Sequence, residues 1–117
     1  MTTTPVTEAE NYVAHAAEEI TTPHSGECLI CYVQRMLEMG CTGLRWATRY
    51  RDLCAPRATR LEATLGRRGG FCDCEILMNA VECTLYDDPS TPEVISLPEC
   101  RGVQRGSTQP CSLWRWS

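Results

Sequence analysis

The sequence contains no lysine, a single phenylalanine and only two histidines among its 117 residues. It has no apolar run near the roughly 18 residues that a membrane-spanning helix needs. It also has no phosphate-binding glycine loop, no nucleophile elbow and no histidine pair with the spacing of zinc proteases. We therefore expect no membrane association and find little support for an enzyme of these motif classes.

The length favours one domain, because single domains commonly have about 100–150 residues. Hydrophobic residues make up 43% and charged residues 22% of the chain, as is ordinary for a globular protein. We expect three parts within this domain: an N-terminal helix and linker (1–24), a cysteine-rich helical core (25–81) and a hairpin or irregular tail (82–117).

Helical spacing of apolar residues predicts about five short helices. The first is expected at 7–20 and begins with a Thr-x-x-Glu capping box. The second and third are expected at 28–39 and at about 44–53. The fourth should follow Pro56, with Leu61 and Leu65 facing inward, and the fifth should run from about Asp73 through Ala80. Beyond these, residues 84–86 and 94–97 could form the two strands of a short hairpin. The predicted fold class is thus a mainly α, small single-domain protein.

Nine cysteines are many for a chain of this length and indicate stabilisation by disulfides or by metal. The first ten residues carry neither a basic region nor an apolar segment of a signal peptide, so we expect a cytoplasmic protein with reduced thiols. The odd count and the closely spaced pairs favour metal over a complete set of disulfides. Plain buried thiols are the third alternative.

Two cysteine pairs, Cys28-x2-Cys31 and Cys72-x-Cys74, each open a predicted helix. Free N–H groups and the helix dipole stabilise thiolate at this position, and thiolate is the metal-binding form. Brought together by folding, the two pairs would make a four-thiolate structural zinc site. Cys41 lies one helix length, roughly 15 Å, from Cys28 and Cys31, so its position predicts a different cluster.

Further candidate ligands lie outside these pairs. Cys100 and Cys111 flank a loop that has no core of its own, and His24 stands four residues before Cys28. Seven cysteines and this histidine would suffice for two four-coordinate zinc ions, with an iron–sulfur cluster as the less favoured alternative. The two remaining cysteines, Cys54 and Cys83, are expected to be small buried hydrophobic residues.

The stretch from Gly69 to Asn79, which contains Cys-Asp-Cys-Glu, and the upstream Gly40-Cys41-Thr42-Gly43-Leu44-Arg45 resemble a small, mainly actinobacterial domain family of unknown function. The resemblance covers about residues 36–80. It implies that Cys41, Cys72 and Cys74 share a metal site. Gly43 stands where the family often has histidine, so Cys28 or Cys31 would supply the fourth ligand.

Charge is unevenly distributed along the chain. Eight of the eleven arginines lie in 28–68, whereas 1–27 and 69–99 contain acids and no arginine. Arg45, Arg49 and Arg51, beside aromatic residues, could contact nucleic acid or a protein partner, could pair with the acidic 69–99 segment, or could donate hydrogen bonds to zinc-bound thiolates.

We interpret the sequence as a zinc-binding structural, interaction or regulatory module with a protein partner. A metal- or thiol-dependent enzyme or redox sensor is the alternative, and nucleic-acid binding through 45–68 is a further one. For an enzyme, Asp73 and Glu75 are the available acids, but both residues also suit the first turn of a helix, with Asp73 as its cap.

Overall fold

The computed structural model describes residues 17–87 and 98–117. Residues 17–20 are helical, which agrees with the end of the first predicted helix; the rest of that helix lies outside the described residues. No helix in the described part of the chain has both the length and the apolar character needed to cross a membrane.

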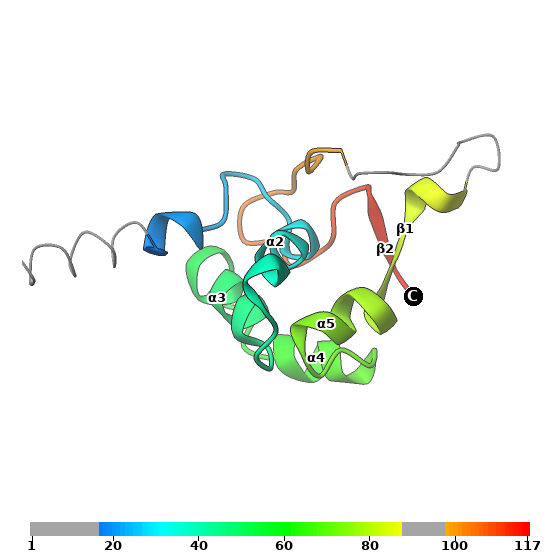
Figure 1. Cartoon of the computed structure of the whole chain (residues 1–117), viewed down its shortest axis with the longest axis horizontal. Helices are drawn as coiled ribbons and strands as arrows, with labels where there is room; N and C mark the ends of the chain where they lie inside the picture. Colours follow the sequence, from blue (N-terminus) through cyan, green and yellow to red (C-terminus); the bar gives the residue numbers. More distant parts are fainter. Residues whose placement is uncertain (1–16, 88–97) are drawn as a thin grey trace, which may run out of the picture.

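Four further helical segments form the body of the domain. They are α2 (Leu29–Met36) with the 3-10 turn η1 (Leu37–Met39), α3 (Arg45–Cys54), α4 (Leu61–Arg67), and α5 (Asp73–Glu75) continued by the π-helical turn η2 (Ile76–Ala80). Figure 1 shows α2 near the middle, with α3, α4 and α5 following one another around it. The mainly helical prediction is therefore confirmed, and the 28–39 helix tightens into a 3-10 turn for its last residues.

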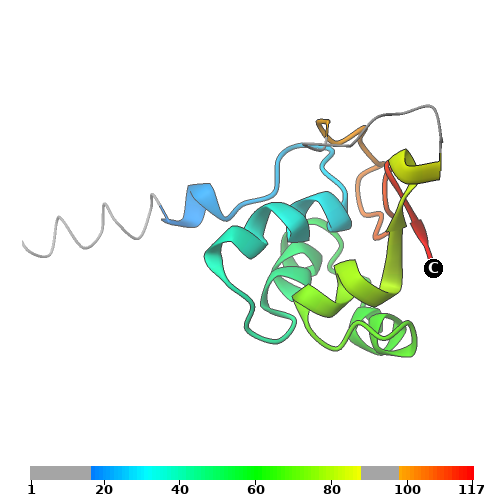
Figure 2. The ribbon, with the colours of Figure 1, turned by 45° about the vertical axis from the view of Figure 1, so that its right-hand side comes forward.

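A two-stranded antiparallel sheet closes one side of the domain. Strand β1 (Val81–Cys83) pairs with β2 (Trp114–Trp116), and Glu82 lies opposite Arg115. The prediction of a strand at 84–86 is wrong, because Thr84–Asp87 forms a 3-10 turn, η3. The strand predicted at 94–97 lies outside the described residues. The partner of β1 is instead the tryptophan-rich end of the chain, seen in red in Figure 2.

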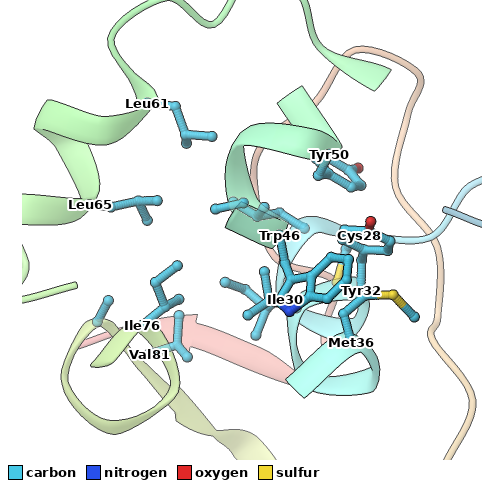
Figure 3. Packing of buried hydrophobic residues seen from close by; sticks show 14 of the residues in the cluster. Cys28, Ile30, Tyr32, Met36, Trp46, Tyr50, Leu61, Leu65, Ile76 and Val81 are labelled. Carbon is cyan, nitrogen blue, oxygen red and sulfur yellow. The ribbon is translucent and has the colours of Figure 1, made fainter. Parts of the chain in front are cut away.

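The hydrophobic core lies between α2 and the elements around it. Tyr32 of α2 and Trp46 of α3 make a T-shaped, edge-to-face contact with ring centroids 6.5 Å apart. Figure 3 shows Leu61 and Leu65 of α4 on one side of Trp46, with Ile76 below them. All of these side chains are at most 4% exposed. Because apolar side chains of α2, α3, α4 and η2 meet here, the core holds α2 against these elements.

The link between α4 and α5 depends on two glycines. Gly69 has φ +85°, in the left-handed region that favours glycine. At Gly70 a Cβ atom would lie 3.0 Å from Ile76 Cγ1 and 3.3 Å from the carbonyl oxygen of Leu65. The absent side chains thus allow a tight turn that brings the start of α5 against the core.

Candidate metal centre

Four thiols from distant parts of the chain gather at the N-terminus of α2. Cys28 is the N-cap of α2, Cys31 lies in its first turn, and Cys100 and Cys111 come from the irregular C-terminal segment. The four sulfur atoms all lie within 4.8 Å of one another, and the Sγ atoms of Cys31 and Cys111 are 3.7 Å apart. A tetrahedral zinc site with Zn–S bonds of about 2.3 Å holds its sulfurs about 3.8 Å apart. This cysteine cluster could therefore hold a metal ion.

Four N–H groups point at sulfur atoms of the cysteine cluster. Cys28 Sγ accepts from the backbone N–H of Cys31 at 3.3 Å, as an N-cap residue does. Cys100 Sγ accepts from the backbone N–H groups of Cys28 at 3.3 Å and Gly102 at 3.4 Å. The indole Nε1–H of Trp114 donates to Cys31 Sγ at 3.3 Å. These donors favour thiolate over thiol, and thiolate is the form that binds metal.

The thiols of the cysteine cluster differ in their burial and in their pKa. Cys28 and Cys111 are buried, whereas Cys31 and Cys100 are half-buried. Hydrogen bonding by the Cys31 thiol, together with the backbone N–H of Cys31, lowers the pKa of Cys28 to about 5 despite its burial. The same contact with Cys28 and the burial of the thiol raise the pKa of Cys31. The interaction between these two thiols thus favours the thiolate form at Cys28 over that at Cys31.

The loop before α2 is held by a buried ion pair. The carboxylate of Glu27, whose side chain is 6% exposed, accepts from Arg35 Nη2 at 2.8 Å and from the backbone N–H of His24 at 3.0 Å. A cavity of about 480 Å³ opens beside this loop, and Cys31 and Cys100 form part of its wall. The cluster thus borders solvent-accessible space on one side.

The expected joining of Cys28 and Cys31 with Cys72 and Cys74 does not occur. The structure places Cys100 and Cys111 there instead. Both residues were candidate ligands, but their spacing gave no indication that they would meet the Cys28 pair. This grouping separates Cys41 from Cys28 and Cys31, as the length of the helix indicated, so neither of them supplies the fourth ligand that the family resemblance implied beside Cys41, Cys72 and Cys74.

Cys41, Cys72 and Cys74 lie together at the other end of α2, as the family resemblance implied. The backbone N–H of Cys74 lies 3.5 Å from Cys41 Sγ, and Cys72 is the N-cap residue of α5. Over the described ranges, however, the cysteine cluster at the α2 N-terminus is the one group whose ligand atoms come close enough together for a metal ion. Metal binding by these three cysteines remains a prediction.

Asp73 performs a role that its position in the sequence did not suggest. We expected it to cap the helix that it begins, but its fully buried carboxylate caps α3 instead. Its two oxygens accept the backbone N–H groups of Trp46 at 3.0 Å and Ala47 at 3.1 Å, and the N-cap residue of α3 makes no side-chain cap of its own. Burial raises the pKa of Asp73, although these backbone N–H groups act against it. With both oxygens engaged, this carboxylate is a structural acid.

The remaining candidate ligands lie apart from the cysteine cluster. His24 is exposed, and its recorded hydrogen bonds involve its backbone atoms and Glu27. Cys54 and Cys83 are half-buried at separate places in the fold, and Cys54 packs against the core. Neither thiol is fully buried, so the expectation that both are small buried hydrophobic residues is wrong in its burial.

The arginines of the proposed contact surface engage groups of the chain itself. Arg51 pairs with Asp52 at 3.1 Å and with Glu62 at 2.7 Å. Arg49 Nε donates to the carbonyl oxygen of Thr21 at 3.0 Å, and the guanidinium of Arg45 lies 4.2 Å from the ring centroid of Trp46. These contacts are internal, but the acidic partners of Arg51 are Asp52 and Glu62 rather than acids of the 69–99 segment that the sequence suggested.

Fold and site define a small helical domain with a four-cysteine cluster that could bind a metal. Residues 29–79 match the model of a family described as "Protein of unknown function (DUF2695)". The matched segment runs from α2 into η2. It contains Cys41, Cys72 and Cys74 but only Cys31 of the cysteine cluster. Comparisons with curated proteins and with solved structures give no match.

Proposed function

We propose that this protein is an interaction or regulatory module whose fold is stabilised by one zinc ion bound to Cys28, Cys31, Cys100 and Cys111. The observation that carries the proposal is the gathering of four thiols within 4.8 Å of one another. Four thiolates complete the tetrahedral coordination that zinc takes in structural sites. A site with four protein ligands has no position for water or substrate, so the metal would have a structural role.

The bound metal would join the C-terminal segment to the helical core. Cys28 caps α2 and Cys31 lies in its first turn, whereas Cys100 and Cys111 belong to the segment 98–117. This segment is also tied to the core by the pairing of β1 with β2, by the backbone hydrogen bond from Val103 N to Gly26 O at 2.9 Å and by the buried Leu113. Between Cys100 and Cys111, however, no residue is buried, so a bound metal would order this loop.

Cobalt substitution tests whether the coordination is closed. Co²⁺ in the cysteine cluster should give a tetrahedral spectrum with strong sulfur-to-metal charge transfer. Added imidazole should leave this spectrum unchanged, because four thiolates leave no position for an external ligand. A spectrum that changes with imidazole would instead indicate an open metal site beside the 480 Å³ cavity and would favour the enzyme alternative.

The partner surface that we propose is the exposed apolar pair Phe71 and Met78. Their side chains are 69% and 76% exposed, near both ends of the α5–η2 segment. A partner that covers these side chains would remove their apolar surface from water, which favours binding. Their replacement by serine should weaken capture of a protein partner, whereas Met39→Ser, at a similarly exposed methionine elsewhere, should not. Capture of nucleic acid that weakens steeply with salt would instead favour the nucleic-acid alternative.

A further inference from the structure

A second group of thiols lies outside the metal centre, where the 40–44 loop meets the start of α5. The backbone N–H of Asp73 donates to the carbonyl oxygen of Gly43 at 2.8 Å, and the buried Asp73 carboxylate binds the first turn of α3. These contacts hold the two segments in a fixed position. Cys41 and Cys72 are therefore held close to each other by backbone and cap interactions that do not involve their thiols.

The geometry of these thiols suits a two-sulfur reaction. Cys41 Sγ accepts the backbone N–H of Cys74 at 3.5 Å, and Cys72 is the N-cap residue of α5, so both cysteines lie at the first turn of this helix. Cys41 is exposed and Cys72 is half-buried. An exposed thiol beside a second thiol is the arrangement found at redox-active cysteines.

We propose that Cys41 and Cys72 form a reversible disulfide when the protein meets a hydroperoxide, as a thiol–disulfide site separate from the cysteine cluster. Cys41 is oxidised first because it is the exposed member. Its sulfur attacks the peroxide oxygen, which gives a sulfenic acid and releases water from hydrogen peroxide. The Cys72 sulfur then attacks the sulfenic sulfur, forms the S–S bond and releases a second water. Two thiols are thereby oxidised to one disulfide, and one peroxide is reduced to two waters.

Peptide mapping of zinc-loaded protein treated with hydrogen peroxide tests the proposal. After free thiols are alkylated, trypsin and a glutamate-specific protease together release peptides 39–45 and 69–75, which carry Cys41 and the Cys72–Cys74 pair. These two peptides should be joined, with the loss of two hydrogens, and dithiothreitol should separate them. The zinc content should stay unchanged during the treatment.

Serine variants identify the pair and provide a matched control. Cys41→Ser and Cys72→Ser should each abolish the link, whereas Cys74→Ser should retain it, because serine keeps the backbone N–H that donates to Cys41. A link that persists in Cys72→Ser would overturn the assignment. Cysteines that become over-oxidised without forming the link would also overturn the assignment. A second bound zinc ion that protects these thiols and is lost in Cys41→Ser would show a metal site here instead.

Discussion

Replacement of Cys100 by serine separates the metal-binding role of a thiol from its hydrogen-bonding role. Cys100 Sγ accepts two backbone N–H groups, from Cys28 and Gly102, at 3.3 and 3.4 Å. A serine oxygen can still accept these N–H groups, since it is small and polar. What the substitution removes is a thiolate ligand, and zinc takes thiolate, imidazole or carboxylate in structural sites rather than a neutral hydroxyl.

The expected loss of stability follows from metal linkage. At free zinc a thousandfold above the Kd of the wild-type site, a ligand bound only to the folded state adds about 4 kcal/mol to the free energy of unfolding. In a domain of this size, 1 kcal/mol shifts Tm by roughly 4–8 °C. If Cys100→Ser abolishes binding at that zinc concentration, Tm should fall by roughly 15–30 °C.

The assay is thermal unfolding followed by circular dichroism at fixed free zinc, with zinc content measured on the same samples. Cys54→Ser is the matched control, because Cys54 is half-buried and lies outside the cysteine cluster. The control should keep its zinc and change the free energy of unfolding by no more than about 1 kcal/mol. Equal zinc content and equal Tm for the two variants would refute the assignment of Cys100 as a ligand.

Three further substitutions test contacts around the site. Trp114→Phe removes the indole N–H that donates to Cys31 Sγ, so metal affinity in a competition titration should fall by about 10–100-fold. Trp116→Phe is the control and should leave the affinity unchanged, because the Trp116 indole donates to Gln109. Asp73→Ala removes the cap of α3 and leaves two backbone N–H groups unpaired, so the free energy of unfolding measured with urea should fall by about 2–4 kcal/mol. The control, Asp52→Ala at an exposed residue, should lower it by less than about 0.5 kcal/mol. Glu27→Ala breaks the ion pair with Arg35 before α2, so the free energy of unfolding measured with urea should fall. The loss should be only about 2 kcal/mol, because the side chain of Arg35 is 29% exposed and its guanidinium can regain water.

The helices could be predicted from the sequence because their signals are local. Apolar residues recur at helical spacing, and Gly40 and Pro56 follow the ends of helices, but α4 begins only at Leu61 and not at the proline that was expected to open it. Strand β1 was placed three residues too late because short strands depend on a partner, and the partner of β1 lies about thirty residues further along the chain. Nothing near Val81 in the sequence identifies Trp116 as the residue opposite.

The grouping of the thiols is non-local for the same reason. Cys28 and Cys100 are 72 residues apart, and their meeting depends on how the C-terminal segment crosses the start of α2. Cysteine spacing within each pair indicates a metal site but does not say which pairs combine. The cap of α3 by Asp73, 27 residues from Trp46, was missed because sequence reasoning looks for a cap next to the helix that it serves.

X-ray absorption at the zinc edge, combined with native mass spectrometry, tests the metal centre most directly. Protein loaded with one equivalent of zinc should carry one ion, and its spectrum should fit four sulfur ligands at about 2.3 Å. The Cys72→Ser variant should give the same spectrum, because Cys72 lies outside the cysteine cluster. A chain that binds no zinc, or a zinc ion with nitrogen or oxygen ligands at about 2.0–2.1 Å, would contradict a site formed by Cys28, Cys31, Cys100 and Cys111.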